Sequence, residues 1–152
     1  MSDGVPGNDA FAVGSTLTGS SRTITDAEIA FLPALMGAIS PLFHDEVRAQ
    51  QSAMKGRILY GPALLGIAVA LTEPILHDRV MGLVELRSVR FRRPVRSGAT
   101  ITASFTVTDS TTREGKPGLM LHLDDTVVDQ TGETVLVFQR LVLVKPVPAA
   151  SA

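Results

Sequence analysis

The residues best placed to do chemistry lie in a short stretch that leads into an apolar run. The stretch is Gly56–Pro62 (GRILYGP), and the apolar run occupies residues 63–71. Pro62 has the fixed φ angle and the missing N–H group that suit the first turn of a helix. A helix that begins here, with Gly61 at its mouth, points free N–H groups outward, and these donors and the helix dipole attract negative charge. Two interpretations stay open: a site that stabilises an oxyanion, and a plain core helix entered through a tight turn.

The apolar run predicts a helix that is buried on every side. Residues 63–71 (ALLGIAVAL) contain no charged or polar side chain, so a helix here has no polar stripe for water. The run is too short to cross a bilayer. We expect this helix to extend from Pro62 to about Leu71, and Glu73 and Pro74 to end or bend it.

The residues before this helix predict a strand, a capped helix and irregular connections. Residues 11–17 fit a short strand that ends at residues 18–20. Thr25 and Glu28 form a capping box, and the helix that follows ends at Gly37. Pro33 removes a backbone hydrogen bond and should kink or shorten that helix. The remaining predictions are an irregular segment over residues 38–44, a short turn capped by Asp45, and a loop over residues 50–55.

After the apolar run the pattern changes to that of strands. Between residues 99 and 108, apolar side chains alternate with Thr and Ser, which predicts a strand with one buried face. Further strands are expected at residues 80–92, 119–128 and 134–144, with turns at residues 114–118 and 129–132. One buried helix followed by antiparallel strands predicts an α+β fold in which a curved sheet covers the helix.

Composition narrows the class of protein. The chain has 152 residues, 45% of them apolar, and a formal net charge of −1, which fits a single globular domain and gives no sign of a nucleic-acid or anionic-membrane partner. The absence of cysteine excludes disulfides and thiolate zinc sites. The first residues lack the features of a secretory signal, so we expect a cytoplasmic protein. We place the domain at residues 11–146, between flexible tails at residues 1–10 and 147–152.

The order of these elements resembles the MaoC-like hot dog proteins, which include (R)-specific enoyl-CoA hydratases and 3-hydroxyacyl-thioester dehydratases. The resemblance covers Thr25 to about Lys145. Its landmarks are Thr25–Glu28, Gly37, Pro41-Leu42, residues 45–49, Tyr60–Leu64, Val89–Val95, Gly98 and Asp129–Glu133. The resemblance implies a hot dog fold, in which a curved antiparallel sheet wraps around one long buried helix.

The family's hydration motif aligns with residues 37–45 and shows a loss. The motif reads Gly-Asp-x-Asn-Pro-x-His-x-Asp, and Gly37, Pro41 and Asp45 fix its register here. In that register Ala38 stands at the position of the catalytic Asp, and Phe43 at the position of the catalytic His. Neither side chain transfers a proton. Gly61, by contrast, falls at the family's oxyanion glycine, so the resemblance implies a thioester-binding half that is kept and a proton-transfer half that is lost.

Other residues could take over the missing role. His44 lies one place beyond the family's His, and the competing interpretation is that it faces solvent. Tyr60 is the only tyrosine and either donates a proton or packs in the core. Asp45 and Ser40 fit turn chemistry, although Ser40 could also hold a ligand. The candidate catalytic residues are therefore His44, Gly61 and Tyr60, and the candidate substrate-binding residues are Ser40, Phe43 and Pro62.

Three hypotheses about function remain open. The first is an active acyl-thioester hydratase or dehydratase with an unusual acid–base group. The second is a non-catalytic hot dog protomer that binds acyl chains or supports a catalytic partner. The third is another reaction, such as an isomerisation or cyclisation, in the same cavity. A thioesterase is disfavoured, because such hot dog enzymes usually place a carboxylate near the buried helix and none lies between Tyr60 and Thr72.

The resemblance also implies partners. The ligand would be an acyl thioester of CoA or of a carrier protein, and an arginine run at residues 87–96 is either its phosphate neighbourhood or a solvated strand edge. We expect a homodimer or a dimer-based oligomer, with a heterodimer with a catalytic homologue as the alternative, because an open sheet leaves an edge to cover. No cofactor, metal, nucleic acid or membrane is expected to take part.

Overall fold

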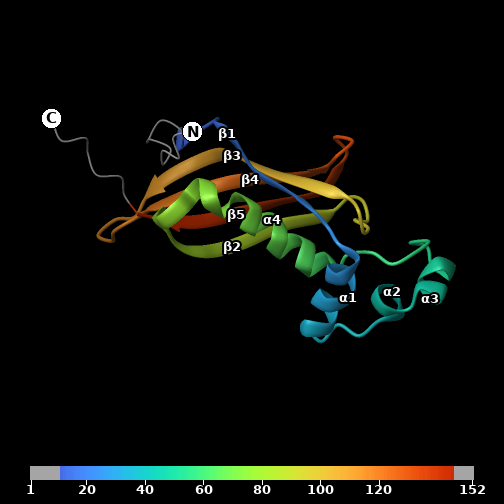
Figure 1. Cartoon of the computed structure of the whole chain (residues 1–152). Coiled ribbons are helices and arrows are strands. Elements are labelled where there is room, and N and C mark those ends of the chain that lie inside the picture. Colours follow the sequence, from blue (N-terminus) through green and yellow to red (C-terminus); the bar gives the residue numbers. More distant parts are fainter. Residues whose placement is uncertain (1–10, 146–152) are drawn as a thin grey trace.

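The computed structural model describes residues 11–145, so the tails predicted at residues 1–10 and 147–152 lie outside the described residues. A five-stranded antiparallel sheet, in the order β1-β3-β4-β5-β2, lies against one long helix, α4, and three short helices form a lobe at one end (Figure 1). In chain order the elements are β1 (Thr16–Thr23), α1 (Asp26–Leu35), α2 (Pro41–His44), α3 (Glu46–Gln51), α4 (Gly61–Leu76), β2 (Val80–Phe91), β3 (Thr100–Thr112), β4 (Leu119–Asp129) and β5 (Thr134–Val144). The predicted α+β class is confirmed.

The core lies between α4 and the inner face of the sheet. On β3 the alternating side chains from Ile101 to Val107 are at most 1% exposed, while their Thr and Ser neighbours are only half-buried. Ala63, Leu64 and Ala68 of α4 pack against this face in one cluster. The alternation that predicted a half-buried strand therefore works because one face of β3 meets the helix and the other meets water.

The first strand differs from its prediction. β1 begins at Thr16 and runs through residues 18–20, where the sequence predicts its end. A Cβ atom on Gly19 would lie 2.3 Å from the carbonyl oxygen of Leu71. β1 thus crosses α4 at Gly19. Because glycine has no side chain, the two backbones can approach closely there, and the strand continues through this residue.

Two predictions about the long helix are wrong. α4 continues past Glu73 and Pro74 to Leu76, because Pro74 falls in the last turn and is exposed, so its missing N–H removes one hydrogen bond without burying an unpaired group. The helix is also not buried on every side. Pro62, Gly66 and Ala70 recur every four residues and are exposed, so they form one small-residue stripe that faces away from the sheet of its own chain.

The lobe of short helices follows its capping signals. Thr25 and Glu28 form the predicted capping box, and α1 stops just before Gly37, which has a φ of 76°. Residues 41–44, expected to be irregular, form the single turn α2, and α3 extends two residues into the expected loop. Pro33 lies inside α1, where it is buried, two residues before the helix ends.

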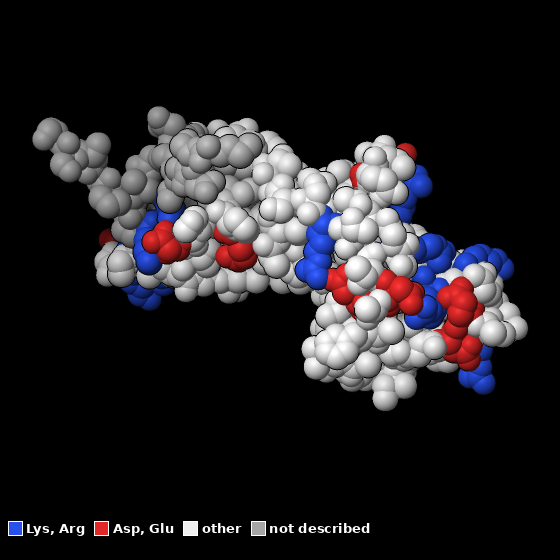
Figure 2. All heavy atoms as spheres, viewed as in Figure 1, with Lys and Arg blue, Asp and Glu red and all other residues white. Residues whose placement is uncertain are grey.

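Charged side chains hold this lobe together. The Arg57 guanidinium contacts carboxylate oxygens of Asp26 at 2.6 Å and of Glu46 at 3.2 Å, and so joins the starts of α1 and α3. In Figure 2 the side chains of both signs gather on the lobe, while the surface over the sheet and α4 carries few charges on this face. These ion pairs add to the apolar packing of Ile29, which joins α1 to the core around α4.

Candidate functional site

An apolar cavity opens at the N-terminal mouth of α4. Its volume is about 210 Å³. It is lined by Met54, Ile58, Leu59, Gly61, Leu64, Phe91, Arg92, Arg93, Pro94 and Val95. Leu59 and Val95 are joined by a 2.7 Å backbone hydrogen bond, so the stretch before α4 and the segment after β2 form one continuous wall. An apolar cavity beside a few polar groups is the usual form of a small-molecule site.

The first turn of α4 supplies polar donors at this cavity. Tyr60 is the N-terminal cap residue, and its carbonyl accepts the N–H group of Leu64 at 3.0 Å. Pro62 has no N–H group, so the first-turn donors that have no helix carbonyl before them are those of Gly61 and Ala63, and of these two residues Gly61 lines the cavity. These donors and the dipole of a 16-residue helix favour an oxygen that carries negative charge.

Phe91 stands directly against Gly61. A Cβ atom on Gly61 would lie 3.1–3.4 Å from three carbon atoms of the Phe91 ring. Glycine at position 61 therefore also makes room for this ring, in addition to any role toward a ligand. Phe91 is a site residue that the sequence reasoning missed, because a phenylalanine at the end of a strand carries no local signal of what it will face.

The residues of the hydration motif separate into inward and outward positions. Phe43 is 9% exposed, and its ring packs edge-on against Tyr60 with the ring centroids 5.2 Å apart. His44 is exposed on the neighbouring position. The structure thus brings Phe43, Tyr60, Gly61 and Pro62 together at the helix mouth and leaves His44 outside this group.

Ser40 and Asp45 cap helices. The Ser40 hydroxyl accepts the N–H group of Leu42 at 3.3 Å at the start of α2, and an Asp45 carboxylate oxygen accepts the N–H group of Arg48 at 3.0 Å at the start of α3. Both side chains therefore make the turn contacts that their types favour. Ala38 is half-buried in the connection between α1 and α2.

The arginine run does not form one surface. Arg87 pairs with Glu85 at 2.7 Å, and Arg93 pairs with Glu133 at 2.7 Å. Arg96 turns the other way and donates to the carbonyl oxygens of Arg57, at 3.3 Å, and of Met54. Only Arg92 and Arg93 of this run line the cavity at the mouth of α4.

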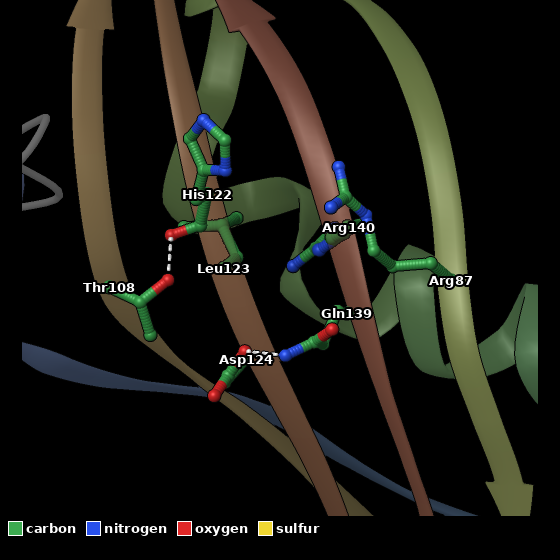
Figure 3. Close-up of a pocket in the computed structure, with 7 residues that line it drawn as sticks. All are labelled: Arg87, Thr108, His122, Leu123, Asp124, Gln139 and Arg140. Carbon is green, nitrogen blue, oxygen red and sulfur yellow. Dashed lines mark hydrogen bonds between the residues drawn. The ribbon is translucent and has the colours of Figure 1, made fainter.

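A second hollow lies on the face of the sheet turned away from α4, and Figure 3 shows the residues that line it. An Asp124 carboxylate oxygen accepts a hydrogen bond from the Gln139 amide at 3.0 Å, and the carbonyl of His122 accepts one from the Thr108 hydroxyl at 3.1 Å. Its volume of about 70 Å³ holds roughly two water molecules. This hollow is too small for an acyl thioester.

A buried ion pair lies between the sheet and the far part of α4. Arg140 donates to Asp125 at 2.9 Å and to the Thr72 hydroxyl at 2.7 Å, and all three residues are at most 3% exposed. Burial raises the pKa of Asp125 to about 6, against the lowering effect of Arg140. The pair could have been found from the sequence, because Asp125 and Arg140 both occupy inward positions of an alternating strand.

Residues 11–145 contain neither a cluster of metal-binding side chains nor a helix that could cross a membrane. No three His, Cys, Asp or Glu side chains come close enough there to hold a metal ion. Among the helices of the same range, none has the length and apolar content needed to cross a membrane.

Comparisons with known proteins identify similar structures. Residues 10–128 match the family model described as MaoC like domain, whereas no curated protein sequence matches the chain. A monoamine oxidase regulatory protein from Archaeoglobus fulgius is 27% identical, with a TM-score of 0.83 over 92% of this chain and 94% of that chain. An (R)-hydratase from A. caviae, described as involved in PHA biosynthesis, is 26% identical, with a TM-score of 0.69 over 86% of this chain and 94% of that chain.

A third structure names the fold. A conserved hypothetical protein from Mycobacterium tuberculosis, described as having a double hot dog fold, is 20% identical with a TM-score of 0.82. The alignment covers 97% of this chain and 46% of that chain. One hot dog unit of that protein therefore matches this whole sheet and helix, and the predicted hot dog fold is confirmed.

Proposed function

The chain belongs to the MaoC-like domain family of hydratases and dehydratases, and we propose that it binds an acyl thioester at the mouth of α4 without the family's usual proton-transfer dyad. One observation carries the proposal. The apolar cavity meets the first turn of α4 at Gly61, while the position expected for a catalytic His is filled by the buried ring of Phe43. In this arrangement the thioester carbonyl accepts a hydrogen bond from the Gly61 N–H group, which stabilises negative charge on its oxygen.

Chemistry beyond polarisation of the carbonyl has weak support at this site. Alanine and phenylalanine at positions 38 and 43 neither hold a water molecule nor take a proton from C2, and His44 is exposed. We therefore expect hydration of crotonyl-CoA to be negligible. This favours a protomer that binds acyl thioesters or supports a catalytic homologue.

A second candidate function is a proton shift, such as an isomerisation, that uses Tyr60. Its ring packs against Phe43 at the mouth of α4, and its hydroxyl makes no hydrogen bond to another residue in the described part of the chain. This phenol belongs to the residue that directly precedes Gly61. Replacement of Tyr60 by Phe separates the two candidates, since it would abolish a proton shift and leave thioester binding in place.

The proposed assembly is a dimer through β2. This strand is at the sheet edge, where Leu83 and Val84 are about half exposed. The exposed small-residue stripe of α4 would let a second helix approach closely. Burial of these surfaces by a second copy, or by a homologous subunit, would cover both the open edge and the apolar side chains.

Calorimetric titration of butyryl-CoA tests the proposed binding. We expect Gly61→Val to weaken binding by at least about tenfold, because the new side chain crowds both the Phe91 ring and the approach to the helix mouth. Ala34→Val is the control: it enlarges an exposed residue of helix α1 that does not line the cavity. Absence of butyryl-CoA binding by the parent protein, or equal binding by the parent and Gly61→Val, would overturn the proposal.

A further inference from the structure

Building on the thioester site proposed above, we propose that Phe91 is the specificity-determining residue that restricts this site to short acyl groups. The ring forms one wall of the cavity and lies 3.1–3.4 Å from the position that a Cβ of Gly61 would take. No carbonyl group can therefore reach Gly61 from that side without displacing the ring. An acyl chain that enters must lie alongside Phe91, between it and Leu64.

The backbone of Phe91 is fixed while its ring is partly free. Phe91 pairs with Leu136 of β5, and the next residue, Arg92, donates its backbone N–H group to the Val135 carbonyl at 2.8 Å. The residue is nevertheless 48% exposed. Sheet hydrogen bonds thus hold the Cα position in place, and rotation of the side chain is the available way to widen the cavity.

The size of the cavity limits the ligand. A volume of about 210 Å³ is below the usual range of ligand pockets, which begins at about 300 Å³. With the Phe91 ring as one wall, a cavity of this size suits a short acyl chain better than a long one. We therefore infer a preference for butyryl-sized chains over octanoyl-sized chains.

The charges at the rim match the other end of such a ligand. Arg92 and Arg93 follow Phe91 directly, line the same cavity and are exposed. Arg93 is paired with Glu133, whereas Arg92 makes no ion pair with another residue between positions 11 and 145. An apolar interior with a cationic rim suits an acyl group whose carrier bears phosphate groups.

Binding of butyryl-CoA and octanoyl-CoA to the intact protein tests the role of Phe91. Saturated chains are used so that turnover does not interfere. We expect the parent protein to bind butyryl-CoA more tightly, and Phe91→Ala to improve the affinity for octanoyl-CoA relative to butyryl-CoA by about tenfold or more. Phe91→Leu should give a smaller shift in the same direction. Phe31→Ala is the matched control, since Phe31 is a more exposed phenylalanine, at 61%, on α1.

The outcomes separate this inference from the proposed function. If both ligands bind and Phe91→Ala leaves their affinity ratio unchanged, Phe91 does not set specificity although the thioester site stands. The same conclusion follows if Phe31→Ala produces an equal shift. If neither ligand binds to the parent protein or to any variant, the thioester site itself is wrong and the inference fails with it.

Discussion

At the scale of single residues, the mouth of α4 is crowded by aromatic rings rather than by acids and bases. Phe43 and Tyr60 pack edge to face on one side, and Phe91 lies against Gly61 on another. Within the described residues, Asp125 is the carboxylate whose pKa is strongly raised. It is buried, pairs with Arg140 and lies away from the mouth of α4. In the described part of the chain, the polar groups at the helix mouth are therefore backbone N–H groups and the side chains of Arg92 and Arg93, with Tyr60 packed beside them.

Restoring the dyad should restore chemistry. In the double variant Ala38→Asp/Phe43→His, we expect crotonyl-CoA hydration to rise by about 10²–10⁴-fold, the usual contribution of a positioned acid–base group. The control is Ala38→Asn/Phe43→His, which keeps the sizes and removes the carboxylate. Loss of the Phe43 ring will cost some stability, so folding and butyryl-CoA binding are checked first. A double variant that folds and binds but gains no activity would show that the register assigned to residues 37–45 is wrong.

The pH dependence of stability should report Asp125. Its pKa is about 6 in the folded protein, mainly because of burial, and its ordinary value is 3.8. Between these values the folded state binds a proton that the unfolded chain does not, so this group adds stability as the pH falls from about 7 to about 4. The gain is on the order of 2–3 kcal/mol.

Urea denaturation of the parent and Asp125→Asn at several pH values measures this effect. The free-energy difference in favour of the parent should grow as the pH falls, because the Asn side chain does not titrate. Asp125→Asn also leaves Arg140 buried without its partner, which costs about 3–5 kcal/mol at neutral pH. Asp109→Asn, at an exposed position of β3 that is not among the groups acting on Asp125, is the control. A free-energy difference that shrinks as the pH falls would mean that Arg140 lowers the pKa of Asp125 by more than burial raises it.

At the scale of elements, local signals predicted most of the fold, and tertiary contacts decided the rest. Alternation located β3, and the capping box located the start of α1. Gly19 and Pro74 were misread as ends of elements, although Gly19 is where β1 touches α4 and Pro74 sits in a tolerant last turn. In the candidate site, the helix mouth at Gly61 could be predicted from the local sequence. The contact with Phe91 could not, because these residues are 30 positions apart and meet only in the folded sheet.

The crossing of β1 and α4 should be sensitive to any side chain at position 19. Gly19→Val places a Cβ atom where the Leu71 carbonyl oxygen is only 2.3 Å away, so strand and helix must move apart. We expect a loss of about 1–3 kcal/mol or more in the free energy of unfolding by urea. Ser20→Val puts the same residue at the next, exposed position of β1 and should cost much less. Equal losses for the two variants would contradict the crossing.

At the scale of the whole molecule, the apolar surface is concentrated on β2 and the lobe. β2 is an edge strand with exposed Leu83 and Val84, and the lobe carries exposed Phe31 and Val47. A sheet edge that bears large apolar side chains is unusual for a lone protomer. These apolar side chains lie on the strand that forms the unpaired edge, which favours β2 as the contact between two copies.

Sedimentation equilibrium at micromolar concentration tests this assembly. We expect the parent to be a dimer or a larger assembly of dimers, and Leu83→Glu to shift it toward the monomer by burying a charge in the interface. Val47→Glu places the same charge on α3, where Val47 is 70% exposed, and should leave the assembly intact. A monomeric parent would count against the dimer, and an unchanged assembly in Leu83→Glu would count against β2 as its contact.

The most direct test of the thioester site is a crystal structure of the protein with bound butyryl-CoA. We predict that the thioester carbonyl oxygen lies about 3 Å from the Gly61 backbone nitrogen. We also expect the acyl chain beside Phe91 and no carboxylate or imidazole near C2 and C3. A ligand bound elsewhere, such as the outer hollow beside Arg87 and His122, would contradict the central claim. So would a ligand at the mouth of α4 with His44 turned inward onto C3.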